Sequence, residues 1–532
     1  MAGERYRQLR GSTDGIRTKA NEWGVCINSM TDSAKNGTSR RVVLARVGGL
    51  GAGLALAGCR APGLDDPETP PDSQRDITLP DRPNVIVVYA DDMGWLDAAF
   101  QGSEYYETPN LDALAEGGLT FSAGYANAPN CAPSRACLLT GQYTPRHQVY
   151  TVNDPTKVAP KRRRLDPPPN NRTLPPENTT IGEVLSAAGY ATGFVGKWHV
   201  GEADSETGPL ARGFGMNVGG GIYGRTPSGY FPPYNLPNLS DSGDQYLTDR
   251  LTDHAVEFIE TRTDGSEPFF LLYSPYSVHE PLQAPDSDIE PYRNKDCWNG
   301  QCNPKYGGMV SALDRTVGRL VDTLEEVGIT EETLVFFSSD NGGVGDYGEV
   351  GITGNWQQYT SQGPLRGGKG TLYEGGIRVP TVLSWPGVVP GDRVRTPILA
   401  SDLFPTLVEL AGAGDAVPDD HTVDGRSLVP LIERSEPTDR GALFWHFPSY
   451  LTGKNLDVFR TRPVSVVRQG RWKLHHYYAG DRTKLYDLRT DRGETENLAQ
   501  RRPEKRDELL ARLERWKDNV GAREPTPRDR SQ

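Results

Sequence analysis

The sequence predicts an α/β fold, on the evidence of buried strands that alternate with amphipathic helices. Residues 84–90 form a continuous apolar, β-branched run, which is typical of a strand buried on both faces. Residues 308–327 carry apolar side chains at helical spacing. Strand and helix signals alternate from one of these segments to the next, as an α/β sheet requires. With 532 residues, the chain is long enough for a large domain and a smaller one.

The first segment, residues 1–59, is predicted to be a leader. Arg40 and Arg41 precede an apolar run, residues 47–57, which is too short to span a bilayer and favours a cleaved signal. The paired arginines resemble a twin-arginine signal. The end of the run, Leu-Ala-Gly-Cys59, resembles a lipobox, although an ordinary signal with a chance cysteine is the alternative. We expect an exported protein, anchored at the cell surface or in the periplasm by a lipid on Cys59.

The remaining chain is expected to divide into three parts. Residues 60–80 are rich in Pro and Asp and predict a disordered tether. A catalytic domain is expected over 81–434 and a smaller α+β domain, with an antiparallel sheet and a terminal helix, over 435–532. The expected strands are 84–90, 191–195, 268–273, 334–337, 465–467 and 472–477. The expected helices are 178–188, 247–260, 308–327, 401–412 and 503–519, and a turn with a short helix is expected over 424–432.

Oxygen-bearing side chains follow two of the buried strands. Asp91 and Asp92 come directly after residues 84–90, and Asp340 and Asn341 follow the strand that begins at Leu334. The carboxyl ends of strands are where open α/β sheets bind ligands, and charges placed there need a partner. Four oxygen donors suit one Ca²⁺ or Mg²⁺. The alternative for each pair is a solvated turn.

A cysteine stands where a loop becomes a helix. Pro133 suits a first helical turn, because a proline has no N–H and the N–H groups there lack helical partners. Cys131 therefore lies at a helix N-terminus, whose partial positive charge favours a thiolate or an anionic ligand. Arg135 adds a cation one turn further on. The alternative is a small buried cysteine that opens an ordinary helix.

Three further side chains are candidates for an anion site. Lys197 and His199 alternate along a segment expected to be extended, so both can face one pocket. Lys369 lies within Gly-Gly-Lys-Gly, a flexible loop whose backbone N–H groups can approach an anion. Taken singly, a surface lysine or a hydrogen-bonded histidine is the commoner arrangement.

Charge and cysteine content argue against nucleic-acid binding and against a zinc site. The formal net charge of −12 argues against nucleic acid as a partner. Cys297 and Cys302 are expected to form a disulfide in an exported protein. A zinc site is disfavoured, because no second Cys-x-x-Cys pair and no His-x-His cluster accompanies these cysteines.

The stretch Cys131-Ala-Pro-Ser-Arg135, followed by Leu-Thr-Gly141, resembles the signature of type I sulfatases. In that family the cysteine is oxidised to formylglycine, whose hydrate attacks sulfur. The resemblance runs from about residue 83 to 520. It includes Asp91-Asp92, Gly196-Lys-Trp-His199, His279-Glu-Pro281, Ser339-Asp-Asn-Gly342, Leu365 to Thr371, Glu374 to Pro380 and Leu485 to Leu488.

The resemblance implies an alkaline-phosphatase-like fold, with a mixed central sheet flanked by helices and a smaller C-terminal α+β domain. It implies a Ca²⁺, with Mg²⁺ as the alternative, held by Asp91, Asp92, Asp340, Asn341 and the modified Cys131. It also implies a formylglycine-generating enzyme as the partner that matures Cys131.

The catalytic residues that the resemblance implies are Cys131, Arg135, Lys197, His199, His279 and Lys369. Arg135 and His199 would hold and activate the hydrated formylglycine. The two lysines and the metal would neutralise the sulfate oxygens, and His279 would protonate the leaving alcohol. These roles fit general chemistry, because preorganised cations stabilise charge on nonbridging oxygens.

The expected substrate is a sulfated carbohydrate, with an aryl sulfate as the alternative. Residues 219–224, 229–234 and 443–447 resemble bacterial sulfatases that act on sulfated sugars, and their aromatic rings either stack on sugars or pack loops. An acidic surface repels a sulfated polymer, so positive charge has to be concentrated in the cleft.

Two other functions compete with the sulfatase interpretation. A phosphate mono- or diesterase of the same superfamily would need further Asp and His ligands for a second metal, and the chain has only eight His. A lipoprotein that only binds sulfated glycans would bind them tightly and release no sulfate.

Overall fold

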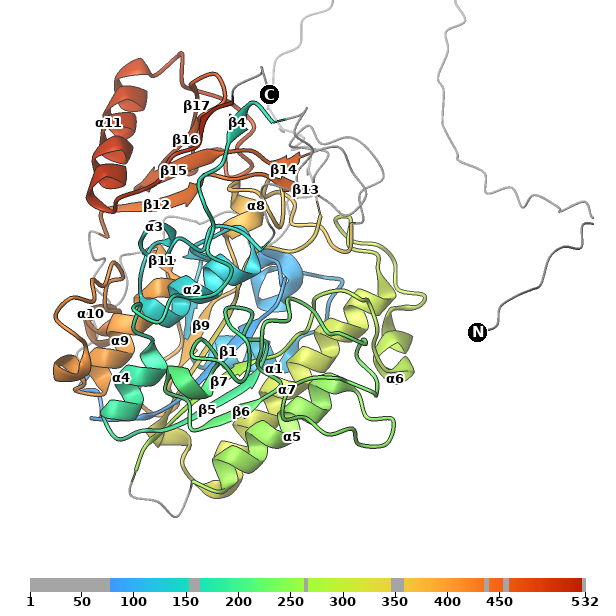
Figure 1. Cartoon of the computed structure of the whole chain (residues 1–532). Helices are drawn as coiled ribbons and strands as arrows, with labels where there is room; N and C mark the ends of the chain where they lie inside the picture. Colours follow the sequence, from blue (N-terminus) through green and yellow to red (C-terminus); the bar gives the residue numbers. More distant parts are fainter. Residues whose placement is uncertain are drawn as a thin grey trace, which may run out of the picture. The chain divides into compact units, whose positions relative to one another are not determined.

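The computed structural model describes residues 77–152, 163–262, 267–345, 358–434, 440–452 and 459–528 (Figure 1). The described residues belong to one compact unit, Arg60–Gln532. The predicted leader, 1–59, and all but the last four residues of the predicted tether lie outside the described residues. Within the described ranges, none of the helices is long and apolar enough to cross a membrane.

Eight strands of the described chain form the central sheet. In spatial order they are β10 (Asp392–Val394), β2 (Leu119–Phe121), β9 (Val382–Ser384), β8 (Thr333–Ser339), β1 (Asn84–Ala90), β7 (Phe269–Ser274), β5 (Ala191–Gly196) and β6 (Met216–Val218). Strand β9 runs antiparallel to both of its neighbours, and the other pairs are parallel. The sheet is therefore mixed, as predicted.

Strand β1 lies between β7 and β8 and pairs with both in parallel. Its apolar, β-branched side chains are buried on both faces of the sheet. Burial on both faces explains why the sequence of this strand is apolar without interruption rather than alternating. Ala90 pairs with Ser339 of β8. Asp91 and Asp340, which follow these two residues, therefore leave the same edge of the sheet side by side.

Helices cover both faces of the sheet. The helices α1 (Pro109–Glu116), α5 (Leu247–Glu260) and α7 (Pro304–Val327) pack on the face that carries Ile86 and Val88. The opposite face, with Val85 and Val87, is covered by α2 (Cys131–Thr140), α4 (Ile181–Ala187), α9 (Leu403–Leu410) and α10 (Val429–Arg434). Figure 1 shows α5 and α7 together on one side of the sheet and α4 and α9 on the other.

Capping side chains account for two shifted helix boundaries. Helix α7 begins at Pro304 rather than 308, because the Asn303 side chain accepts hydrogen bonds from the first turn. Helix α4 begins at Ile181 rather than 178, because Thr180 and Glu183 form a capping box. The expected helix 401–412 is a 3₁₀ turn, Ala400–Asp402, followed by α9. The short helix expected within 424–432 is α10, which begins at Val429 and ends at Arg434. The bounds predicted for α5, α11 and β1 are confirmed.

A smaller sheet follows the main one, as predicted. Its antiparallel order is β12 (Ala442–Phe447), β15 (Val464–Gln469), β16 (Trp472–Tyr477) and β17 (Arg482–Asp487). Helix α11 (Pro503–Asn519) packs against this sheet through Leu509, Leu513 and Trp516. Shorter elements are β3 (Gly124–Tyr125), β4 (Leu165–Asp166), β11 (Ile398–Leu399), β13 (Leu451–Thr452), β14 (Phe459–Thr461), β18 (Thr526–Pro527), α3 (Thr144–His147), α6 (Asp286–Ile289) and α8 (Glu374–Ile377).

A buried ion cluster joins the smaller sheet to the rest of the unit. Lys473 on β16 lies 2.8 Å from Glu374 of α8 and 3.1 Å from Glu494, and all three side chains are fully buried. Burial alone would raise the pKa of Glu374, but Lys473 and Arg378 outweigh it and hold that pKa well below its usual range. The predicted disulfide between Cys297 and Cys302 is also present.

We expect Lys473→Met to lower the free energy of unfolding by about 3–5 kcal/mol, because it removes the cation that the buried carboxylates of Glu374 and Glu494 share. Urea denaturation measures this loss. The control is Lys505→Met, which removes an ion pair on the surface of α11 and should cost less than about 1 kcal/mol. Equal losses in the two variants would show that the cluster does not hold the smaller sheet in place.

Candidate active site

The side chains that follow β1 and β8 form a buried cluster. The backbone N–H of Asp92 donates to Asp340 Oδ1 at 3.2 Å, and Asn341 Nδ2 donates to Asp92 Oδ1 at 2.8 Å. Asp91, Asp340 and Asn341 are fully buried, and Asp92 is nearly so. Asp92 has a φ of 64°, a left-handed conformation that is uncommon in residues other than glycine and that clusters at active sites.

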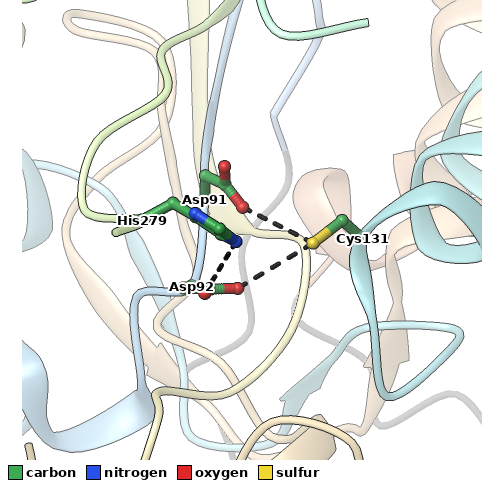
Figure 2. Close-up of side chains that lie close together, drawn as sticks. All are labelled: Asp91, Asp92, Cys131 and His279. Atoms are coloured by element: carbon green, nitrogen blue, oxygen red, sulfur yellow. Dashed lines mark hydrogen bonds and ion pairs between the residues drawn. The ribbon is translucent and has the colours of Figure 1, made fainter. Parts of the chain in front are cut away.

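Cys131 opens helix α2 and faces this cluster (Figure 2). Its Sγ lies 3.6 Å from Asp91 Oδ1 and 3.9 Å from Asp92 Oδ1. The helix N-terminus predicted for Cys131 is therefore present, and Cys131 lies next to the strand-end carboxylates with which the family resemblance groups it. The structure brings together residues that are about 40 positions apart.

Three cations balance the three carboxylates of the cluster. Lys197 Nζ lies 2.7 Å from Asp91 Oδ2, and Lys369 Nζ lies 2.6 Å from Asp92 Oδ1. Arg135 donates through Nε to Asp340 Oδ2 at 2.9 Å. Because the charges of these described side chains cancel, a divalent cation would leave the site positive and suited to an anionic ligand.

His279 lies at the edge of the cluster. Its Nδ1 donates to the carbonyl oxygen of Glu280 at 2.9 Å, since a carbonyl can only accept, and its Nε2 lies 3.6 Å from Asp92 Oδ2. Figure 2 shows the ring directed at Asp92. Burial and Lys369 lower the pKa of His279 to about 3, so the imidazole is neutral at pH 7. It can donate a proton only when a nearby anion raises that pKa.

His199 is placed differently from the prediction. The segment is not extended at this residue, because its φ is 65°. His199 Nε2 faces Gly224, where an added Cβ would lie 2.5 Å away. Among the described residues, His199 Nδ1 is buried without a hydrogen-bond partner. Burial, with Lys197 and Arg135 nearby, holds the pKa of His199 well below its usual range.

The thiol of Cys131 does not behave as the helix N-terminus alone predicted. Burial raises its pKa to about 12; Lys197 and Lys369 pull the pKa down, whereas Asp340 and Asp91 push it up. Of the two alternatives predicted for this helix end, a thiolate or an anionic ligand, the first is therefore disfavoured in this environment. Burial outweighs the partial charge of the helix end.

The two adjacent carboxylates are held in different states. Burial raises the pKa of Asp91 to about 7, although Lys197 opposes the rise. Burial has the same effect on Asp92, but Lys369 and His279 outweigh it and bring the pKa of Asp92 below its usual range. Paired lysines are thus required to keep this cluster charged.

The cluster fits a metal ion. Ligand atoms of Asp91, Asp92, Cys131 and His279 all lie within 4.8 Å of one another. Asn341 Oδ1 is buried and has no hydrogen-bond partner among the described residues, so an oxygen donor is available. Carboxylate and amide oxygens are ligands for hard divalent cations. His279 was expected as a proton donor, and this grouping adds it as a possible ligand.

The structure bears on two other expectations about loops. The backbone N–H groups of Lys369 and Gly370 donate to Gly343 and Pro129, at 2.9 and 2.7 Å, so these two N–H groups of the Gly-rich loop are not available to an anion. Of the two alternatives for the aromatic rings, stacking on sugars or packing of loops, most of the rings take the second: Tyr230, Tyr234, Trp445 and Phe447 are buried, whereas Tyr223 is 41% exposed.

Sequence reasoning missed two residues that position the site. Ser274, at the end of β7, accepts a hydrogen bond from Arg135 Nη1. The strand-end rule that found Asp91 could have found it. Asp97 accepts from Gly94 N at 2.8 Å and from Tyr306 Oη at 2.7 Å, and so fixes the loop that follows Asp92. Its position carries no recognisable signal in the sequence.

Comparison with known proteins identifies the family. The family model described as Sulfatase matches residues 83–413, and the model described as N-sulphoglucosamine sulphohydrolase, C-terminal, matches residues 368–519. N-acetylgalactosamine-6-sulfatase of Canis lupus familiaris is 32% identical over 75% of this chain and 72% of its own length. Arylsulfatase A of Homo sapiens is 33% identical over 78% of this chain and 83% of its own.

A solved structure agrees with these relatives. The crystal structure of Ps i-CgsB in complex with k-i-k-neocarrahexaose is 30% identical and superposes with a TM-score of 0.66, covering 82% of this chain and 92% of that chain.

Addition of a divalent cation to EDTA-treated protein should raise its melting temperature, because an ion that binds only the folded state stabilises it by about 2.7 kcal/mol at a hundredfold excess over Kd. Titration with Ca²⁺ and with Mg²⁺, followed by differential scanning fluorimetry, measures the shift. Asp340→Asn should reduce the shift at each concentration.

The matched control is Asp415→Asn, which changes an exposed carboxylate in the same way. It should keep the full shift of the unaltered protein. A cation response that is the same in both variants would place the metal elsewhere.

Proposed function

Because the chain belongs to the sulfatase family of the alkaline phosphatase-like superfamily, and is a sulfuric ester hydrolase, we propose that it removes sulfate from a carbohydrate sulfate ester. The reaction runs through a formylglycine hydrate made from Cys131. The observation that carries the proposal is the buried contact of Cys131 Sγ with Asp91 and Asp92 at 3.6 and 3.9 Å, beside Lys197 and Lys369.

The proposed nucleophile is one hydroxyl of the hydrate. In the structure, Cys131 Sγ stands in for an oxygen of this group. Attack on sulfur forms an O–S bond and breaks the bond between sulfur and the alcohol oxygen. Arg135 fixes two groups that surround the nucleophile. It donates to Asp340 Oδ2 at 2.9 Å and to the carbonyl oxygen of Lys197 at 2.7 Å. His199, neutral and buried beside these cations, accepts a proton.

The leaving alcohol takes its proton from His279. The bound sulfate ester brings a negative charge next to the imidazole, which raises its pKa from the low value of the free protein. Lys197 and Lys369 face the charge that develops on the sulfate oxygens. The second hydroxyl of the hydrate then gives its proton to the imidazole of His279, which protonation of the alcohol has left neutral. The bond between the carbon of residue 131 and the sulfate oxygen breaks as the aldehyde C=O forms, sulfate leaves, and the aldehyde takes up water.

A Ca²⁺, or Mg²⁺, would be held by Asp91, Asp92, Asp340, Asn341 and the modified residue 131. When bound, such an ion withdraws charge from the sulfate oxygens as a Lewis acid. The carboxylates that would hold it are fully buried or nearly so. His279 contacts Asp92 and thereby stays next to the ion site.

Carbohydrate is favoured over an aryl group as the alcohol by one relative that is named for a sugar sulfate and one that is solved with a bound carbohydrate. N-acetylgalactosamine-6-sulfatase is 32% identical, and Ps i-CgsB, solved with k-i-k-neocarrahexaose, is 30% identical. Arylsulfatase A, at 33%, keeps an aryl sulfate as the second candidate. We further propose export by the twin-arginine route, a lipid on Cys59, and maturation of Cys131 by a formylglycine-generating enzyme.

Cys131→Ala should abolish sulfate release from sulfated oligosaccharides, because it removes the only precursor of the nucleophile. Ion chromatography of free sulfate measures the reaction. The matched control is Cys137→Ala, which alters a second buried cysteine of the same helix, 3.4 Å from His147 and away from the carboxylates. It should retain most of the activity. Substantial sulfate release by the Cys131 variant would reject the nucleophile.

His279→Gln should lower kcat by about 10²- to 10⁴-fold for a sugar sulfate, whose alkoxide leaves poorly without a proton. The loss should be much smaller for 4-nitrophenyl sulfate, because nitrophenolate leaves unprotonated. Comparing kcat for the two esters checks the role. Equal losses for both esters would show that His279 positions the site rather than protonating the alcohol.

A further inference from the structure

A cavity of about 710 Å³ lies against the inner face of the smaller sheet, outside the Cys131 cluster. Five cationic side chains line it: Arg460, Arg462, Arg482, Lys484 and Arg506. None of the described residues that line it is acidic. This is unusual in a chain whose formal net charge is −12. Positive charge is therefore concentrated at this cavity.

Aromatic rings form one wall of the cavity. Tyr373 packs on His475 with ring centroids 4.8 Å apart, and its hydroxyl accepts a hydrogen bond from Tyr477 at 3.0 Å. Lys484 Nζ donates to Tyr373 Oη at 2.8 Å and lies 5.4 Å from the centre of the Tyr477 ring. Lys484 is therefore held against the rings of Tyr373 and Tyr477 by contacts within the protein.

The cations differ in how far they are engaged within the protein. Arg506 pairs with Asp507 at 2.7 Å, so its charge is partly compensated. Arg462 and Arg482 are exposed, and the guanidinium of Arg462 lies 5.8 Å from the centre of the Phe459 ring. Guanidinium groups bind sulfate and carboxylate with two parallel hydrogen bonds. These two arginines are therefore the side chains best placed to take an anion from solvent.

The cavity lies next to the loop that carries Lys369 into the active site. Thr371 lines it and follows Lys369 by two residues, and Lys369 contacts Asp92. Between them, Gly370 donates to the carbonyl of Pro129, two residues before Cys131. A Cβ at Gly370 would lie 2.6 Å from Leu451 and 3.4 Å from Arg460. One loop therefore contacts the active centre on one side and a cavity residue on the other.

We propose that this cavity binds a second anionic group of the substrate, a sulfate or a carboxylate on a sugar unit away from the ester that is cleaved. The inference rests on the proposed function, because it assumes a carbohydrate in the active site. The guanidinium groups of Arg462 and Arg482 hold the anion, and the aromatic rings of the cavity wall pack against the sugar. A polyanionic chain is thus preferred over a singly sulfated one, even though the protein as a whole is acidic.

The test is binding of a heparin-derived hexasaccharide to the full chain with Cys131→Ala, measured by isothermal titration calorimetry. Adding R462Q/R482Q should weaken binding by about three- to thirtyfold, as expected for two solvent-accessible ion pairs. The difference should shrink near 1 M NaCl, where the screening length falls to about 3 Å. The matched control is R489Q/R515Q, which removes two exposed arginines of the same region that do not line the cavity.

The control should bind as tightly as the Cys131→Ala protein. Equal affinity of R462Q/R482Q and R489Q/R515Q would overturn the proposal, provided that both melt at the same temperature. A fully desulfated hexasaccharide separates the two anions. If R462Q/R482Q weakens its binding as well, the cavity takes carboxylate; if only the sulfated chain is affected, it takes sulfate.

Failure of the proposed function gives a different result. In that case the unaltered protein would release no sulfate from sulfated oligosaccharides, while R462Q/R482Q would still weaken binding of the hexasaccharide. Sulfate release without any effect of R462Q/R482Q on binding would reject the cavity and leave the proposed function intact.

Discussion

The structure depends on the cost of burying three carboxylates at one edge of a sheet. Asp91, Asp92 and Asp340 emerge from neighbouring parallel strands and are almost completely buried. Each needs a cation nearby, and Lys197, Lys369 and Arg135 supply one apiece from three other segments. The segments that bring these cations are therefore fixed in position by the carboxylates, and Cys131 is held among them.

The cations of the site are held in place before a substrate binds. In the free protein, Lys197 and Lys369 pair with Asp91 and Asp92, and the same two lysines would face the sulfate oxygens during the reaction. A divalent cation would add positive charge to a cluster whose charges otherwise cancel. Low exposure makes each of these interactions stronger than it would be in water. The same burial raises the pKa of the Cys131 thiol to about 12, so an unmodified cysteine is a poor nucleophile here.

The sequence predicted the parts of the fold and site that depend on local pattern. Strand β1 and the carboxylates after it follow from one apolar run, and Cys131 at a helix start follows from Pro133. What was missed depends on contacts between distant segments. Glu374 and Lys473 are 99 positions apart. The left-handed backbone of His199 is set by packing, which overrides the extended form expected from local sequence. Packing also buries the rings of Tyr230 and Trp445, for which the sequence left sugar stacking and loop packing open. The domain limits at 81–434 and 435–532 stay predictions.

The central claim is that residue 131 acts as formylglycine, and the mass of the tryptic peptide that ends at Arg135 tests it most directly. The protein should be isolated from its native host in a form that releases sulfate. The account predicts a peptide about 18 Da lighter than the cysteine form, because an aldehyde replaces the thiol. A peptide that carries only unmodified Cys131 in a preparation with full activity would contradict it.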